Sequence, residues 1–238
     1  MIKRKKRIAF AAVCAALILG FLLYAGIYYH ADETAAAAMG SDGTVTVTRT
    51  DYGWLLDGPS ADDALVFYPG AKVEETAYMP LLHRLAAEGM DVCLVKMPLR
   101  FAFFAPNRAD DLIEEYGYSH WYIGGHSLGG AIAANYAAGH PELLEGVILL
   151  AAYPTKELDD DLLLLSLYGS EDGVLNMEKL TESDRFAPDR YIKREISGGN
   201  HAGFGNYGAQ RGDGEAAISA EEQQEQTVDL ILESIDKD

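Results

Sequence analysis

The stretch Trp121-Tyr-Ile-Gly-Gly-His-Ser-Leu-Gly-Gly-Ala-Ile-Ala-Ala-Asn-Tyr-Ala-Ala138 decides the fold of this chain. It begins as a short apolar strand, turns sharply at Gly125-His-Ser-Leu-Gly129, and continues as an Ala-rich helix. A serine between two glycines at a strand-to-helix turn forms a nucleophile elbow, whose hydroxyl is exposed on a strained backbone. A side chain at either flanking glycine would collide where strand and helix pass closely. The stretch therefore predicts Ser127 as a nucleophile.

The sequence on both sides of the elbow alternates between apolar strands and helices. A hairpin is expected over Thr44–Asp57, and helices are expected to begin at Asn107, as a capping residue, and at Ser219, which forms a capping box with Glu222. Further strands are predicted at 64–68, 91–96, 146–152, 162–168 and 191–196, and further helices at 75–88 and 176–181. The pattern predicts one α/β domain over residues 44–238. Its mostly parallel, doubly wound sheet should carry the site at the carboxyl ends of the strands.

A serine nucleophile needs a base, and the base needs an acid that orients it. In this architecture the order along the chain is serine, acid, histidine. Of the six histidines, three precede the elbow, His126 adjoins Ser127 and should point elsewhere, and His140 comes before any suitable acid. Only His201 remains, in a glycine-rich loop after a strand. We therefore expect His201 to be the base.

The acid should follow the strand before that loop. Asp172 stands there in a Gly-x-x-Asp-x-Val turn, with Glu171 as the alternative, whereas Asp159, Asp160 and Asp161 precede a strand at the wrong end of the sheet. The oxyanion of a tetrahedral intermediate needs two N–H donors. One is expected from Leu128 at the helix N-terminus, and the other from Ala71, or else Lys72, in the loop after the 64–68 strand.

The N-terminus differs in charge from the rest of the chain. Lys3-Arg-Lys-Lys-Arg7 precedes an uncharged run from Ile8 to Tyr29, which is long enough to span a bilayer and would place the domain outside the cytoplasm. The alternative is a cleaved signal peptide and a secreted protein. Residues 1–30 are thus expected to be an anchor, and residues 31–43 a tether.

Charge and cysteine content exclude several classes of function. The net charge is -18, and with residues 1–30 set aside the remaining 14 basic and 37 acidic residues leave -23. Such a body should repel nucleic acid. Cys14 and Cys93 are not expected to pair, and the predicted chemistry requires no metal or organic cofactor.

At these motifs the chain resembles the α/β-hydrolase superfamily over Thr44–Ile235, and more narrowly the small bacterial group related to dienelactone hydrolases. The shared stretches are Phe67–Val73, Leu94–Pro98, Gly125–Gly129, Gly169–Asp172, Gly199–Gly205 and Gly212–Gly214. The resemblance implies Ser127 as nucleophile, Asp172 as acid and His201 as base. Dienelactone hydrolases themselves use a cysteine, so their lactone substrate is not implied.

Between the predicted strands at 146–152 and 162–168 there is no room for a cap domain, so the site should be open. Leu99, Phe101, Phe103 and Phe104 either pack locally or form an acyl pocket or a membrane-facing lip. The chain is accordingly expected to be a serine hydrolase that cleaves carboxylic esters, or related acyl bonds, of a small-molecule substrate through an acyl-enzyme. The alternatives are a catalytically silent binding protein and an acyltransferase or peptidase that uses the same residues.

Overall fold

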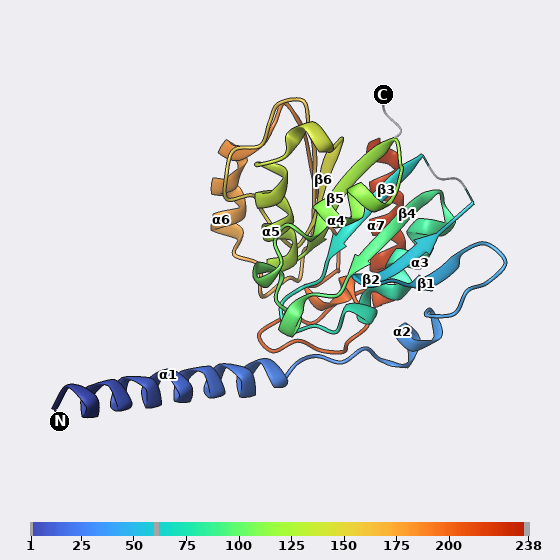
Figure 1. Ribbon diagram of the computed structural model, residues 1–238. Coiled ribbons are helices and arrows are strands. Elements are labelled where there is room, and N and C mark those ends of the chain that lie inside the picture. The colour runs from blue at the N-terminus through green and yellow to red at the C-terminus, as the bar shows by residue number, and fades with distance from the viewer. Residues whose placement is uncertain (1, 60–61, 236–238) are drawn as a thin grey trace.

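The computed structural model describes residues 2–59 and 62–235, without the side chains of residues 2–5, 8 and 9. Its centre is a single sheet with the strand order β1-β2-β4-β3-β5-β6-β7-β8 (Figure 1). The strands are β1 (Thr46–Arg49), β2 (Gly53–Asp57), β3 (Asp63–Tyr68), β4 (Met90–Val95), β5 (His120–His126), β6 (Gly146–Leu150), β7 (Leu163–Gly169) and β8 (Arg190–Ile196). All of the predicted strands are present, with ends that differ by a few residues.

Strand directions follow the sequence pattern. The predicted hairpin is antiparallel, and β2 pairs antiparallel with β4, whereas β3 to β8 pair in parallel. The chain leaves β3 for β4 on one side and later returns to β5 on the other side. Tyr68, the last residue of β3, is in register with Gly125 of β5. The loops that follow β3 and β5 therefore start side by side, at the switch point where open sheets of this type bind ligands.

Helices cover both faces of the sheet (Figure 1). One face packs against α3 (Met79–Ala87) and α7 (Ala220–Ile235), and the other against α4 (Arg108–Glu115) and α5 (Leu128–Ala137). Shorter helices are α6 (Met177–Glu182), η1 (Glu75–Tyr78), η2 (Pro98–Arg100), η3 (Ala102–Phe104), η4 (Pro141–Leu143), η5 (Ser183–Phe186) and η6 (Ala202–Phe204). Between β6 and β7 the described chain forms no helix, which confirms the prediction that no cap domain is present.

The two hydrophobic layers explain why β3 is apolar at every position after Asp63, from Ala64 to Tyr68. Leu65 and Phe67 point into the layer beneath α3 and α7, while Val66 and Tyr68 point into the layer beneath α4 and α5. A strand buried on both faces gains no free energy from polar residues on either side, so it is a continuous apolar run and not an alternating one.

Helix starts agree only in part with the expected caps. The Ser219 hydroxyl accepts a hydrogen bond from Glu222 N at 3.1 Å, as a cap requires. Asn107 precedes α4, but its side chain makes no capping hydrogen bond, so the prediction of a cap there is wrong. Its backbone lies at φ -100° and ψ 24°, outside the extended conformation that a capping residue usually adopts.

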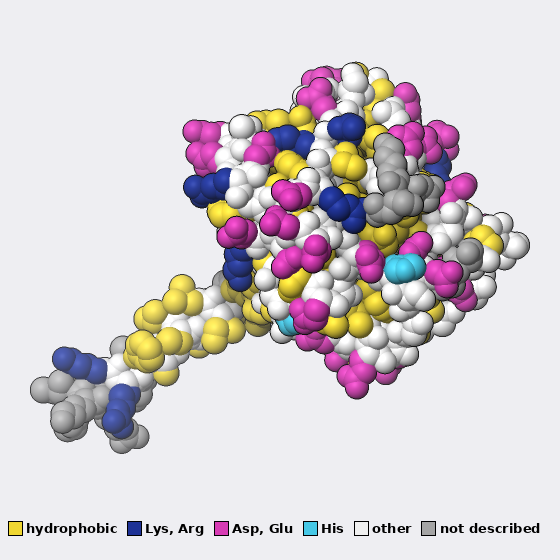
Figure 2. Space-filling model, turned by 90° about the horizontal axis from the view of Figure 1, so that it is seen from above, with side chains coloured by type: hydrophobic (Ala, Val, Ile, Leu, Met, Phe, Trp, Pro, Cys, Tyr) yellow, Lys and Arg dark blue, Asp and Glu magenta, His cyan; other side chains and the backbone are white. Residues whose placement is uncertain are grey.

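The N-terminal helix α1 (Ile2–Gly26) extends away from the body of the molecule (Figure 1). Many of its apolar side chains are exposed, and basic side chains lie at its outer end, while acidic side chains are spread over the body (Figure 2). The predicted span starts at Ile8, and the side chains of Ile8 and Ala9 lie outside the described ones. Within the described part of the chain, no helix is both long enough and apolar enough to cross a membrane.

Residues 31–43 do not form the tether that their composition suggests. They contain α2 (Glu33–Ala37), which is capped by Asp32 and has Ala35 fully buried. Further along, the Asp42 carboxylate accepts hydrogen bonds from Thr44 N and Val45 N at 2.7 and 2.8 Å. The prediction of a tether is wrong because these small residues fit closely against α3 and η1, a contact that composition alone does not reveal.

Candidate active site

Ser127 lies at the turn between β5 and α5, as predicted. Its backbone is in the left-handed region at φ 53°, which a non-glycine residue rarely occupies. A Cβ atom at Gly125 or at Gly129 would collide with the carbonyl oxygen of Tyr68. The two glycines therefore permit β3, β5 and α5 to pass closely, and this close approach holds the turn that presents Ser127.

His201 and Asp172 are in direct contact. Nδ1 of His201 lies 2.8 Å from Oδ2 of Asp172, and both side chains are buried. The other carboxylate oxygen, Oδ1, accepts hydrogen bonds from Val174 N and Leu175 N, each at 2.8 Å. The carboxylate is thus fixed in the turn after β7 and can orient the imidazole. Glu171, the alternative acid, is exposed and accepts a hydrogen bond from the Ser170 hydroxyl instead.

Ser127 and His201 line the same cavity, which has a volume of about 300 Å³. Its other walls are Leu128, Ala131, Ala151, Ala152, Tyr153, Thr155, Val174, Leu175 and Asn176. Nε2 of His201, the nitrogen not used by Asp172, is buried and has no hydrogen-bond partner among the described residues. No hydrogen bond joins it to Ser127 among those residues. Hydrogen bonds of this kind are often long in free enzymes and shorten when substrate binds.

Two backbone N–H groups, one in the loop after β3 and one at the turn after β5, are available as donors. Leu128 is the first residue of α5, so its N–H has no acceptor within the helix. Among the described residues the N–H of Ala71, in the loop 69–74 after β3, also has no acceptor. Lys72, the second candidate, is already engaged, because its N–H donates to the Arg100 carbonyl at 3.0 Å. Of these two candidate donors in the loop, the structure leaves only Ala71 free.

His126 has a position that the sequence did not predict. Its ring is buried, with its centroid 4.5 Å from that of His201, and its Nδ1 lies 2.8 Å from the Tyr78 hydroxyl. That hydroxyl also accepts the N–H of Gly70 at 3.1 Å. Burial, and secondly the neighbouring His201, lower the pKa of His126 well below its usual value, so the ring is neutral. Tyr78 and His126 thereby hold Gly70 of the loop 69–74 through a chain of two hydrogen bonds.

Asp213 is a second residue whose importance sequence reasoning missed. Its Oδ1 accepts hydrogen bonds from Gly173 N and His201 N at 3.1 Å, and its Oδ2 accepts one from Ala202 N at 2.8 Å. One carboxylate thus joins the turn that carries Asp172 to the loop that carries His201. The signals in the sequence were its place between Gly212 and Gly214, which is typical of many turns, and the membership of this stretch in the family resemblance, which assigned it no role.

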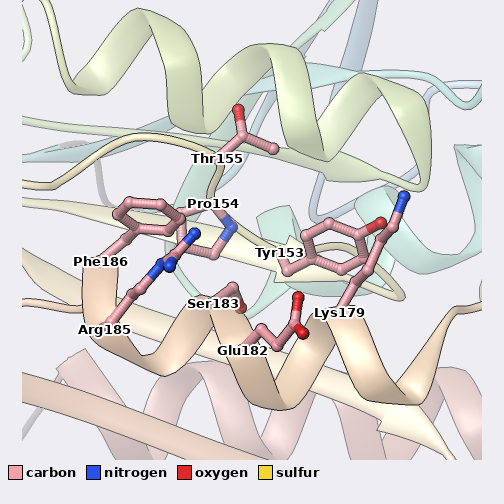
Figure 3. Close-up of a pocket in the computed structure, with 8 residues that line it drawn as sticks. All are labelled: Tyr153, Pro154, Thr155, Lys179, Glu182, Ser183, Arg185 and Phe186. Atoms are coloured by element: carbon pink, nitrogen blue, oxygen red, sulfur yellow. The ribbon is translucent and has the colours of Figure 1, made fainter.

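A groove adjoins the cavity and shares Tyr153 and Thr155 with it. Its volume is about 220 Å³, and the segment 153–155 faces α6 and η5 across it (Figure 3). The other lining residues are Pro154, Lys179, Glu182, Ser183, Arg185 and Phe186. Because both spaces are open to solvent and contiguous, a substrate larger than the cavity beside Ser127 has room to extend toward α6.

The predicted rim residues divide into two groups. Phe101 is buried; its ring lies 5.1 Å from that of Phe103 within the same loop and 5.8 Å from that of Phe21 in α1, so it is a packing residue. Leu99, Phe103 and Phe104 remain exposed by 42%, 44% and 47%. Over the described residues, no cluster of His, Cys, Asp or Glu side chains is arranged to hold a metal ion.

Comparison with known proteins agrees with this architecture. Est1E from Butyrivibrio proteoclasticus, with ferulic acid bound, aligns over 84% of this chain and 99% of its own with a TM-score of 0.59 and 15% identity. A CIB-like hydrolase from Thermoplasma acidophilum aligns over 79% and 98% with a TM-score of 0.58 and 14% identity. Mouse alpha/beta hydrolase domain-containing protein 10 aligns over 82% and 99%, with a TM-score of 0.57 and 11% identity. These identities are low enough that the likeness concerns the fold.

The comparison with curated proteins finds no match. The family model described as "Alpha/beta hydrolase family" matches residues 64–225, which is more than half of the chain and includes Ser127, Asp172 and His201. This match agrees with the eight-stranded sheet and with the serine at the elbow. The chain belongs to the alpha/beta hydrolase family.

Proposed function

We propose that this protein is a serine hydrolase that cleaves carboxylic esters through an acyl-enzyme. Ser127 attacks the acyl carbon, and Nε2 of His201 takes the hydroxyl proton and later gives it to the leaving alcohol. Asp172 holds the imidazole through Nδ1 and stabilises the imidazolium that forms. Water then attacks the acyl carbon while His201 takes its proton, and the acid is released as His201 returns the proton to Ser127. The single observation that best supports the proposal is that Nε2 of buried His201 is left free while Asp172 holds Nδ1.

The negative charge that develops on the acyl oxygen would be stabilised by the N–H groups of Leu128 and Ala71. Donors that are fixed before the reaction cost little reorganisation, and removing one such donor typically lowers kcat by about 10² to 10³-fold. The start of α5 adds the positive end of its helix dipole. A carboxylic ester fits these groups as a substrate, because its carbonyl oxygen, like that of any acyl compound, becomes an oxyanion in the step that they would serve.

The test is labelling by a fluorophosphonate probe, which phosphonylates an activated serine. The wild type should be labelled and should release nitrophenol from short p-nitrophenyl esters, whereas Ser127→Ala should do neither. Ser119→Ala is a matched control because Ser119 is exposed at the opposite end of β5. Equal labelling of wild type and Ser127→Ala would overturn the assignment of the nucleophile. No labelling and no turnover in the wild type would favour the silent binding protein.

Product analysis identifies the leaving group and the molecule that accepts the acyl group. Free acid as the product in the presence of added alcohols and amines supports the hydrolase, and transfer to the alcohol or cleavage of amides supports the acyltransferase or peptidase. Est1E binds ferulic acid, a carboxylic acid with an aromatic ring, so aromatic esters belong in the first substrate panel. The narrower kinship to the dienelactone hydrolase group stays a prediction.

We propose also that the part of the predicted span Ile8–Tyr29 that lies in α1, up to Gly26, is an uncleaved membrane anchor that holds the domain on the extracytoplasmic side. Tyr28 and Tyr29 are excluded from it, because they are bound to the domain. The basic cluster Lys3–Arg7 before it and the exposed apolar side chains along α1 support this proposal. Alkaline extraction of membranes should leave the protein in the pellet, and the mass of the isolated protein should include residues 1–30. A mature chain that begins between Ala31 and Met39 would contradict the anchor and support secretion.

A further inference from the structure

The chain that follows α1 is bound to the loop 69–74, which carries the Ala71 N–H. Tyr29 forms a parallel bridge with Val73. The N–H of Tyr29 donates to the Lys72 carbonyl at 2.7 Å, and its carbonyl accepts the N–H of Glu74 at 2.9 Å. Two residues further on, Ala31 N donates to the Glu74 carboxylate at 3.2 Å. This segment, Tyr28–Asp32, is thus hydrogen-bonded to the residues before and after Val73 at the end of the loop.

The loop needs such support because its backbone is strained. Lys72 lies at φ 61°, and its N–H is bonded to Arg100, which with Leu99 also lies in the left-handed region at φ 62° and 52°. Each such residue costs of the order of 1 kcal/mol or more and persists only where its surroundings over-determine it. We therefore expect that the loss of one of these contacts would let the loop relax to an ordinary conformation and would displace the Ala71 N–H.

Aromatic side chains before and within the segment hold the same two cationic residues. The Arg100 guanidinium lies 3.2 Å from the centroid of the Tyr28 ring, and the Lys72 ammonium lies 3.7 Å from that of Tyr24. A cation over an aromatic face is stabilised by about 0.5–2 kcal/mol. The strained residues of both loops are therefore fixed through their side chains as well as through their backbones.

The segment also reaches the loop that carries His201. The Tyr29 hydroxyl accepts the N–H of Arg211 at 3.1 Å, and the N–H of Asp32 donates to the Asn206 carbonyl at 2.9 Å. The rings of Tyr29 and Tyr207 lie 5.6 Å apart. One short piece of chain therefore touches both the loop that carries the Ala71 N–H and the loop that carries the base.

We propose that Tyr28 and Tyr29 are positioning residues for the oxyanion donor: they act through Lys72 and Arg100 to hold the Ala71 N–H in place. The proposal rests on the proposed function, because it assigns a role to the segment in that same reaction. It follows that the protein works with this segment attached. Proteolytic removal of residues up to Met39 would remove a part of the active site as well as the N-terminal helix.

The test uses the full chain with Tyr29→Pro, which removes the N–H that Lys72 accepts. Glu33→Pro is the matched control, because Glu33 is the first residue of α2, where proline is tolerated, and it is exposed. We expect Tyr29→Pro to lower kcat for a p-nitrophenyl ester about 10²-fold with KM within about twofold, as loss of one oxyanion donor does. Glu33→Pro should keep the wild-type kcat.

A second readout separates positioning from a general structural role. An alkyl boronic acid, which forms a tetrahedral adduct with the serine, should bind Tyr29→Pro more weakly by about the same factor as kcat falls. A product carboxylic acid, which forms no oxyanion, should bind as it does to the wild type. Wild-type kcat and boronate affinity in folded Tyr29→Pro would overturn the inference, and so would equal weakening of both ligands.

Tyr28→Leu keeps every backbone hydrogen bond and serves where Tyr29→Pro does not fold. Loss of the ring beneath Arg100 should lower kcat and boronate affinity together, by about fivefold, which corresponds to about 1 kcal/mol. Unchanged values in Tyr28→Leu would overturn the inference. Failure of the proposed function is recognised separately, because the wild type itself would then neither turn over esters nor react with the fluorophosphonate.

Discussion

The two ends of the sheet differ in whether certain buried polar side-chain atoms have hydrogen-bond partners. At the amino end, the buried carboxylate of Asp91 accepts Gly58 N at 2.8 Å and the Tyr118 hydroxyl at 2.7 Å, so both oxygens are satisfied. At the carboxyl end, Nε2 of His126 and Nε2 of His201 are buried without a partner among the described residues. A buried polar atom without a hydrogen bond costs about 1–3 kcal/mol, so it persists where it serves a function.

Backbone strain has the same distribution. Over the described residues, five residues other than glycine have positive φ, and all five lie in loops that follow the strands β3, β4, β5 and β6. They are Lys72, Leu99, Arg100, Ser127 and Ala151. The comparison teaches that backbone strain in the described residues is concentrated at the carboxyl end of the sheet, where the proposed reactive groups lie, and that the contacts compared at the amino end carry no such strain.

The largest expected effect comes from substituting one buried carboxylate at each end of the sheet and comparing the two variants. Asp172→Asn should lower kcat by about 10⁴-fold, because the amide no longer holds His201 in the tautomer that leaves Nε2 free to accept a proton. Asp91→Ala should leave kcat within about threefold but lower the free energy of unfolding by about 2 kcal/mol, since Gly58 N–H and the Tyr118 hydroxyl lose their acceptor.

Ester turnover and urea unfolding of both variants measure this difference. Wild-type turnover in Asp172→Asn, or a 10⁴-fold loss in Asp91→Ala, would abolish the distinction between the two ends.

Asp213 provides a second test of the comparison. It lies at the carboxyl end, yet its carboxylate accepts hydrogen bonds from the backbone N–H groups around it. Asp213→Asn replaces one acceptor oxygen by an NH₂ group that would face an N–H group of the loop around His201. We expect kcat to fall about 10²-fold through displacement of His201, together with a loss of about 2 kcal/mol in unfolding free energy.

Asp159→Asn is the control, since Asp159 is exposed and its carboxylate accepts the N–H of Asp161, within its own turn. If Asp213→Asn lost stability but kept wild-type kcat, Asp213 would be structural only.

The smallest expected effect concerns pH. His126 is held neutral in the folded protein because burial lowers its pKa, whereas in the unfolded chain it titrates near its ordinary value of about 6.5. The unfolded state therefore binds the proton more readily, and His126 makes folding less favourable as the pH falls below about 6.5, by up to about 1.4 kcal/mol per pH unit. His126→Asn should reduce the loss of stability between pH 7 and pH 5.5.

Urea unfolding at several pH values measures this slope. The control is Ser119→Ala at the amino end of β5, which removes an exposed side chain that does not titrate and should leave the slope unchanged. An unchanged slope in His126→Asn would show that the buried imidazole does not contribute to it.

The features that the sequence determined by itself are those with a local cause. Apolar runs without alternation mark strands buried on both faces, and the two glycines around Ser127 follow from the close passage of β3 and α5. The choice of His201 and Asp172 was possible because the chemistry requires an acid and a base in a set order after the serine, and few residues qualified. In the structure the side chains of these two residues are in contact, and their roles in a reaction belong to the proposed function.

What only the tertiary structure decided are contacts between residues far apart in the chain. His126 contacts Tyr78, Asp213 contacts the turn after β7, and Tyr29 contacts Lys72. No pattern in the local sequence predicts these partners. The predicted tether failed for this reason: small residues are compatible with a flexible linker and with close packing alike, and the surface that they meet decides between the two. Local propensities specify elements, whereas pairings across such separations depend on how all the elements pack together.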